Sequence, residues 1–214
     1  MKYHLGINKF TLAERADPAD EIWQTNQGWQ AVFRKRAEYA RQFARNKTCL
    51  DLCCGTGWTT YEIGKIATHV VGIDYADEAI AAAKSKYSRS NIDYKVMNAQ
   101  SLQLADEAFD VVVCMEAIEH FSQKDGLQVL RETHRVLKTG GILIGSTPAI
   151  NDRNPLLLRL LKLRDPYHLF LYSESLLREA LSSVFATIDI EQQHEGWLLF
   201  KCWKHEKYVH GKSL

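Results

Sequence analysis

The chain has 214 residues, of which 46% are hydrophobic and 25% charged, a composition typical of a globular α/β protein with a sizeable core. A formal net charge of +1 excludes a global field that would draw in nucleic acid or an anionic membrane. No apolar run approaches the roughly 20 residues that span a bilayer, and the N-terminus lacks the apolar core of a signal peptide. The five cysteines form no Cys-x-x-Cys pair, so we expect a cytoplasmic protein with buried free thiols and no thiolate zinc site.

We expect one domain with four segments. An N-terminal arm leads into a helix whose apolar positions recur every three or four residues. A core of alternating strands and helices follows, and an irregular insertion separates it from a last helix and two strand-like runs. The segments are 1–46 for the arm and helix, 47–148 for the cofactor-binding core, 149–175 for an acceptor-side insertion, and 176–204 for the last helix and hairpin.

Seven apolar runs are expected to form strands. In chain order the strands are 48–53, 69–73, 93–97, 109–115, 141–146, 186–192 and 197–203, and the helices are 29–45, 58–67, 76–87, 124–137 and 175–184. The alternation of strands and helices predicts a parallel sheet, whereas the short connection around Gly196 predicts an antiparallel hairpin. The predicted fold class is therefore α/β, a Rossmann-like three-layer sandwich with a seven-stranded, mostly parallel sheet that ends in an antiparallel hairpin.

A glycine-rich turn follows the first strand, in the run LDLCCGTGWTT. Asp51 ends this strand, Gly55 and Gly57 let the backbone approach a ligand closely, and Asp74 closes the second strand where nucleoside-binding sheets hold ribose hydroxyls. These features predict a nucleoside-containing ligand. Thr60 stands where a nicotinamide fingerprint needs glycine or alanine, so an oxidoreductase is the less favoured interpretation, and a Gly-rich turn without a nucleotide remains open.

The chain resembles the class I methyltransferases over residues 48–148, in the runs LDLCCGTG, VVGIDYADEAIAAAK, FDVVVCMEAIEHF and LKTGGILIGSTP. This resemblance implies S-adenosylmethionine as the methyl donor, with its methionine portion at the glycine turn, its ribose on Asp74 and its adenine on Tyr75. The family usually has glycine in place of Cys53 and tends to have aspartate in place of Asn98. The implied donor site comprises Asp51, Cys53, Gly55, Gly57, Asp74, Tyr75, Asn98, Ala99, Gln100 and Met115.

The fourth strand ends in Glu116-Ala-Ile-Glu119-His120. If this segment is helical, Glu116, Glu119 and His120 share one face; the alternative is a solvated, capping turn. The arrangement resembles ubiquinone-pathway O-methyltransferases and small-RNA 2′-O-methyltransferases, where such residues and a later histidine bind a divalent cation. The resemblance implies that Glu116, Glu119, His120 and His168 could hold Mg²⁺ or Mn²⁺. Without a metal, His120 or His168 could act as general base, so we predict Glu116, His120 and His168 as catalytic residues.

These observations predict O-methylation of a small-molecule, quinone-like or glycan-linked acceptor. An RNA 2′-O-methyltransferase and a cofactor-binding module without turnover remain alternatives, although the near-neutral charge disfavours a nucleic-acid partner. The run LLLRLLKL, with Arg159 and Lys162 on one face, could be a lid, a membrane-surface contact or a cap on the core. The sequence leaves the acceptor and the oligomeric state open.

Overall fold

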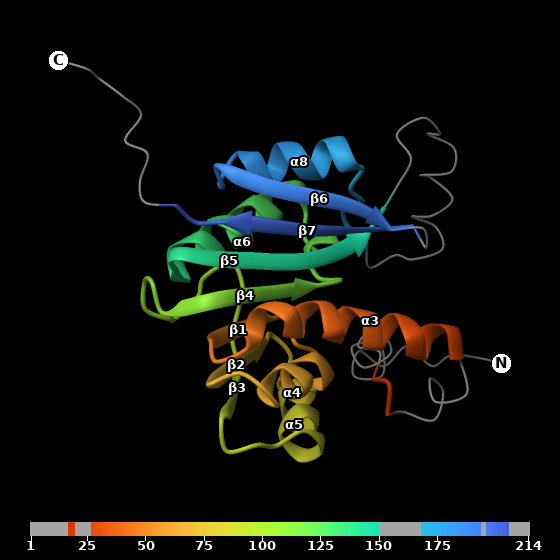
Figure 1. Cartoon of the computed structure of the whole chain (residues 1–214), viewed down its shortest axis with the longest axis vertical. Coiled ribbons are helices and arrows are strands. Elements are labelled where there is room, and N and C mark those ends of the chain that lie inside the picture. Colours follow the sequence, from red (N-terminus) through yellow and green to blue (C-terminus); the bar gives the residue numbers. More distant parts are fainter. Residues whose placement is uncertain (1–16, 20–26, 150–167, 194–195, 206–214) are drawn as a thin grey trace. The chain divides into compact units, whose positions relative to one another are not determined.

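A computed structural model describes residues 17–19, 27–149, 168–193 and 196–205, which are coloured in Figure 1. The run LLLRLLKL, with Arg159 and Lys162, lies outside these residues. The chain divides into two compact units, residues 1–103 and residues 104–214, which are described in turn.

Among its described residues, the first unit contains three parallel strands in the order β3-β2-β1, together with three helices. Leu50 of β1 pairs with Val71 of β2, and Val71 pairs with Asp93 of β3. Four of the five residues of β1 and five of the six residues of β2 are buried, as expected for parallel strands that are covered on both faces. The elements are α3 (Gln27–Ala44), β1 (Thr48–Leu52), α4 (Trp58–Gly64), β2 (His69–Asp74), α5 (Asp77–Lys86) and β3 (Ile92–Val96).

The second unit contains four strands in the order β4-β5-β7-β6 (Figure 1). β4 and β5 are parallel, whereas β7 pairs antiparallel with both β5 and β6. Ser122 caps α6 and Ser173 caps α8, each by accepting a backbone N–H within the first turn. The elements are β4 (Phe109–Met115), the 3-10 helix η1 (Ile118–His120), α6 (Gln123–Val136), β5 (Leu137–Pro148), α8 (Glu174–Ser182), β6 (Thr187–Gln193) and β7 (Trp197–Trp203).

The predicted fold class is confirmed: parallel strands alternate with helices, and the last two of the seven strands form an antiparallel hairpin. The largest boundary difference is at β5, which begins at Leu137 rather than Gly141. Leu137 pairs with Phe109, and a register shift follows before Val111 pairs with Ile142. The glycines in this stretch favour a later start in the sequence, but cross-strand pairing with β4 extends the strand.

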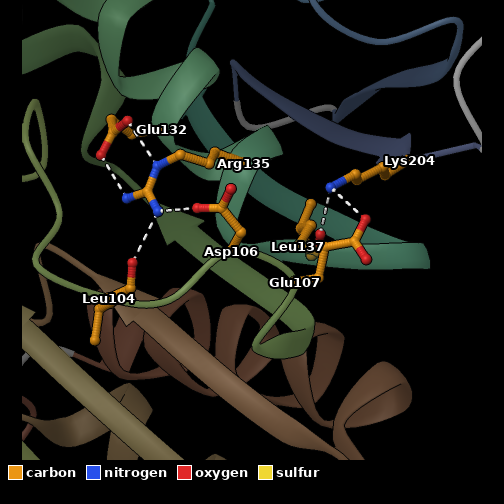
Figure 2. A network of polar contacts seen from close by, with 7 residues as sticks. All are labelled: Leu104, Asp106, Glu107, Glu132, Arg135, Leu137 and Lys204. Carbon is orange, nitrogen blue, oxygen red and sulfur yellow. Dashed lines mark hydrogen bonds and ion pairs between the residues drawn. The ribbon is translucent and has the colours of Figure 1, made fainter.

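A polar network connects the ends of several elements of the second unit (Figure 2). The Arg135 guanidinium donates to Glu132 at 2.8 and 3.0 Å, to Asp106 at 2.6 Å and to the Leu104 carbonyl at 2.8 Å. Such a planar fork suits several simultaneous acceptors. The network therefore fastens the last turn of α6 to the loop that precedes β4.

A buried lysine at the end of β7 forms the other half of Figure 2. Lys204 Nζ donates to the Leu137 carbonyl at 2.7 Å and lies 3.2 Å from a Glu107 carboxylate oxygen. Lys204 is only 9% exposed. Its ammonium therefore satisfies a buried backbone acceptor at the start of β5.

Lys204→Met should lower the free energy of unfolding by roughly 1–3 kcal/mol, because the buried Leu137 carbonyl loses its charged donor. Lys201→Met in β7, the strand that Lys204 directly follows, is the control. Lys201 pairs with Asp189, whose side chain is 51% exposed, and such an ion pair contributes about 0–1 kcal/mol. Urea denaturation of both variants measures the difference. Equal losses would show that Lys204 acts only as a surface charge.

Within the described residues, no helix is long and apolar enough to cross a membrane. The structure describes all five cysteines and shows no disulfide bond among them; three are buried and two are half-buried. The predicted burial is found for three of the five thiols, and the cytoplasmic location stays a prediction.

Candidate functional site

The glycine turn between β1 and α4 has a left-handed backbone at three positions: Cys53 with φ 55°, Gly55 with φ 54° and Gly57 with φ 91°. The Cys54 amide donates to the Ile73 carbonyl at 2.8 Å and so ties the turn to β2. Glycine adopts these angles without strain, whereas cysteine does not. The left-handed angle explains why glycine is expected at position 53, and the turn keeps this conformation with cysteine there.

Gly57 is also packed closely by its neighbours. A Cβ atom at this position would lie 2.7 Å from the Tyr94 hydroxyl and 2.9 Å from Ala83 Cβ. The Tyr94 hydroxyl lies 3.3 Å from the Gly57 carbonyl and 3.1 Å from the Tyr87 carbonyl. Tyr94 of β3 and Ala83 of α5 thus pack against the turn at a position where only glycine fits.

Asp51 is the last but one residue of β1 and is 2% exposed. Burial is the largest influence on its carboxyl and raises the pKa to about 7. The hydrogen bond from Thr60 lowers the pKa in part, and the negative charge of Asp74 raises it further. The Thr60 hydroxyl donates to Asp51 Oδ2 at 2.6 Å. Thr60, which argued against a nicotinamide site, therefore has a positive role as the partner of Asp51.

Asp74 ends β2 and contacts both the glycine turn and the residue that precedes α5. Its two carboxylate oxygens accept from the Gly55 amide and from the Ala76 amide, each at 3.1 Å. The next side chain, Tyr75, is 67% exposed. The Met97 amide donates to the Asp74 carbonyl at 2.9 Å and brings the end of β3 to the same place.

The remaining predicted donor residues follow this last contact. Asn98 is exposed and its side-chain oxygen accepts from the Gln100 amide at 2.9 Å, while Ala99 is buried between them. The structure therefore gathers nine of the ten predicted donor residues at one edge of the first unit. The tenth, Met115, ends β4 in the second unit.

These residues fit an adenosyl group with an amino-acid tail. Two buried carboxyl groups, Asp51 and Asp74, suit the positive charge and the ribose hydroxyls of such a ligand, because a carboxylate oxygen can accept two hydrogen bonds. The exposed ring of Tyr75 offers a flat apolar surface for a base.

Asp17 is a buried residue of the first unit that the sequence did not reveal. Its carboxylate accepts from the Tyr87 hydroxyl at 2.5 Å, from Lys86 at 2.9 Å and from the Ala19 amide at 2.9 Å. Burial alone would raise the pKa of Asp17, but these three partners lower it below its ordinary value. The contact fastens the N-terminal segment to α5.

A second group of polar residues lies in the second unit, after β4. One ligand atom each of Glu119, His120 and His168 lie within 4.8 Å of one another. The two imidazole rings meet edge to face with centroids 5.1 Å apart. The Phe170 amide donates to the Glu119 carbonyl at 3.1 Å, which brings the segment after residue 167 against η1.

The prediction that residues 116–120 form one helical face is wrong. Only Ile118–His120 are helical, as a single 3-10 turn, and Glu116 has a left-handed φ of 47°. The Glu116 side chain accepts from Ser146 at 2.6 Å and from the Trp197 indole at 2.7 Å and does not belong to the cluster of Glu119, His120 and His168. The hydrogen bonds from Ser146 of β5 and Trp197 of β7 hold the Glu116 side chain, so the helical i, i+3, i+4 spacing of the sequence does not decide where it lies.

Several neighbours of this cluster carried no sequence signal. The Thr147 hydroxyl donates to Glu119 Oε2 at 3.0 Å, in a position where both residues are fully buried. Burial, together with the charges of Cys114 and Glu119, raises the pKa of Tyr172 to about 12. Tyr172 therefore stays a neutral phenol beside an acidic group. In the run DPYHLFLY, the sequence pattern had indicated only His168.

Known proteins are similar to this chain in sequence. The model of a methyltransferase domain matches residues 50–145. The chain is 42% identical to the ubiquinone biosynthesis O-methyltransferase of Ruegeria pomeroyi over 108 residues. The matched stretch is 50% of this chain and 42% of the relative. It is 32% identical to the protein of the same name from Hydrogenovibrio crunogenus over 161 residues, 67% of this chain and 66% of the relative. The chain thus spans between about two fifths and two thirds of these relatives.

The fold is shared more widely. The solved structure of a protein from Pyrococcus horikoshii matches with a TM-score of 0.72 at 22% identity, over 90% of this chain and 98% of that protein. The matched domain model contains the glycine turn, Asp74 and β4. The chain therefore belongs to the class I S-adenosylmethionine-dependent methyltransferases.

Proposed function

We propose that the chain transfers a methyl group from S-adenosylmethionine to an oxygen atom of a small phenolic or quinone-like acceptor. The observation that carries the proposal is the cluster of Glu119, His120 and His168, whose ligand atoms lie within 4.8 Å of one another. An oxygen acceptor must lose a proton on methylation, and this cluster offers groups that promote such a loss. Two relatives whose names state O-methylation in ubiquinone biosynthesis support the same acceptor class.

The bound donor supplies a methyl group that its sulfonium already activates, so the protein mainly aligns the reactants. In this proposal Asp74 holds the ribose hydroxyls and Tyr75 covers the adenine. The buried Asp51 faces the positive charge of the methionine portion. His120 or His168 removes the proton from the acceptor hydroxyl, because a neutral imidazole has a ring nitrogen that can accept it.

The same cluster fits a divalent cation. Two imidazole nitrogens and one carboxylate oxygen form a mixed N,N,O set, which suits Mn²⁺ or Zn²⁺ better than Mg²⁺, a cation that prefers oxygen ligands. The Thr147 hydroxyl donates a hydrogen bond of 3.0 Å to the Glu119 carboxylate, as residues that orient a metal-binding carboxylate commonly do. A cation there would supply a Lewis acid that lowers the pKa of an acceptor hydroxyl.

His168→Ala should reduce turnover roughly 100-fold or more, since the variant loses either a general base or a cation ligand. The assay measures S-adenosylhomocysteine released with 3,4-dihydroxybenzoate as a simple catechol. Treating the wild type with EDTA, and then adding back Mn²⁺, Zn²⁺ or Mg²⁺, separates the two roles of the histidine. Calorimetry with Mn²⁺ alone tests the cation site without turnover.

The matched control is His205→Ala, which removes an exposed histidine of the same unit that bonds Thr187. Both variants should bind S-adenosylhomocysteine as the wild type does. If His168→Ala turns over catechol normally, the assignment of the acceptor site is wrong. Methyl transfer to a structured RNA but to no phenol would favour the RNA 2′-O-methyltransferase alternative, and donor binding without any turnover would favour a binding module.

A further inference from the structure

Asp17 is a fully buried carboxylate of the first unit that holds one residue, Tyr87, by its hydroxyl. Oδ1 of Asp17 accepts from this hydroxyl at 2.5 Å and from the Ala19 amide at 2.9 Å. Oδ2 accepts from Lys86 Nζ at 2.9 Å. A buried charge is stable only where it is paired and hydrogen-bonded. Because both oxygens are engaged, the carboxylate has a fixed direction, and so does the Tyr87 hydroxyl.

Tyr87 contacts the glycine turn through its backbone and through its ring. Its carbonyl lies 3.1 Å from the Tyr94 hydroxyl, which also lies 3.3 Å from the Gly57 carbonyl. Its ring meets the ring of Trp58, the residue after Gly57, edge to face with centroids 5.9 Å apart. Tyr87 and Tyr94 belong to one buried apolar cluster, against which Trp58 also packs. A displacement of Tyr87 therefore reaches the turn by two routes.

The glycine turn has no free space where it meets these residues. A Cβ atom at Gly57 would lie 2.7 Å from the Tyr94 hydroxyl and 2.9 Å from Ala83 Cβ. Close-packed interiors contain few voids and transmit strain, so the Gly57 backbone must follow a shift of Tyr94. A ligand aligned by this turn is sensitive to such a shift, because a misplacement of about 1 Å can cost roughly 100-fold in rate.

We propose that Asp17 is a positioning residue for the methyl donor: by holding Tyr87, it fixes the glycine turn where the methionine portion of S-adenosylmethionine binds. This inference rests on the proposed placement of the donor at the turn and is independent of the acceptor. Asp17 lies outside residues 50–145, the part of the chain that matches the methyltransferase domain model. A residue before the shared domain thus contributes to donor affinity through Tyr87.

The test is calorimetric titration of S-adenosylhomocysteine into wild type, Asp17→Ala, Tyr87→Phe and the double variant, at a temperature well below the unfolding transition of each. Phenylalanine removes the hydroxyl and keeps the ring. Each single variant should bind the ligand roughly 3- to 10-fold more weakly. The double variant should bind no more weakly than the weaker single variant, because both substitutions remove the same contact. Losses that multiply would show that the two residues act separately and would overturn the inference.

Asn91→Ala is the matched control for lost stability. The Asn91 amide donates to the Gly64 and Ala67 carbonyls at 2.9 and 3.1 Å, beside the end of α4 that is opposite to the glycine turn. Asn91→Ala should therefore lower the free energy of unfolding, as Asp17→Ala does, but it should bind S-adenosylhomocysteine as the wild type does. A merely structural Asp17 would behave like Asn91.

Two failures are distinguishable. Wild-type affinity in Asp17→Ala, or an equal loss of affinity in Asn91→Ala, overturns this inference and leaves the proposed function standing. Failure of the wild type to bind S-adenosylhomocysteine overturns the proposed placement of the donor at the turn, and this inference with it.

Discussion

Asp51→Asn should raise the free energy of unfolding at pH 8 by up to about 4 kcal/mol, because burial raises the pKa of this carboxyl to about 7 in the folded protein from an ordinary value of 3.8 in the unfolded chain. Between these two values the folded state keeps a proton that the unfolded state releases. Wild-type stability therefore falls as pH rises through this window and stays low above it. Asparagine has no proton to lose, so the variant lacks this dependence.

Urea denaturation at pH 5 and pH 8 measures the effect, and the gain over wild type should be larger at pH 8. The control is Asp93→Asn, because the Asp93 side chain is 59% exposed and its substitution should change stability by less than about 0.5 kcal/mol. A loss of stability of the same size at both pH values would mean that Asp51 is needed as a structural hydrogen-bond acceptor rather than tolerated as a buried acid.

The same substitution should weaken donor binding, because the buried carboxyl that lowers the stability of the protein is also expected to bind the donor. The ammonium group of the ligand's amino-acid tail favours the ionised form of Asp51, so wild-type affinity for S-adenosylhomocysteine should fall as pH drops below about 7. Asp51→Asn should bind roughly 10-fold more weakly and with little dependence on pH. Calorimetry between pH 6 and 8.5 tests this. A variant that binds as tightly as wild type at pH 8 would remove Asp51 from the donor site.

The geometry of the candidate donor site was predictable because its signal is local. A strand, a turn with Gly55 and Gly57, and an acid at the end of the next strand lie within a short stretch, and hydrogen bonds within that stretch, such as Gly55 to Asp74, fix their geometry. Cys53 shows that a left-handed position can be read from the place where glycine is expected. The buried partnership of Thr60 with Asp51 followed only from the structure.

The acceptor side was less predictable because its contacts are distant in sequence. Glu116 and Trp197 are 81 residues apart, so no spacing rule indicates their bond, and helical periodicity wrongly placed Glu116 beside Glu119. Asp17 and Tyr87, 70 residues apart, pose the same difficulty in the first unit. Local patterns reveal which residue types carry chemistry, but cross-strand pairing decides which of them meet.

Gly57→Ala should lower the free energy of unfolding by roughly 2–4 kcal/mol, through two separable costs. The first is the left-handed backbone, φ 91°, at about 1–2 kcal/mol for alanine. The second is crowding, because the new Cβ would lie 2.7 Å from the Tyr94 hydroxyl and 2.9 Å from Ala83 Cβ, and overpacking of a core costs about 1–3 kcal/mol. Thermal and urea denaturation both report the sum.

Gly140→Ala separates the two costs, since Gly140 has a similar φ of 80° but no atom within 4 Å of the added Cβ. It should lose only the backbone cost, about 1–2 kcal/mol, and it should bind S-adenosylhomocysteine as wild type does. Gly57→Ala should bind it at least 10-fold more weakly, because Tyr94 or the turn must shift where the methionine portion is held. Equal losses of stability and equal ligand affinities in the two variants would show that close packing at Gly57 does not shape the donor site.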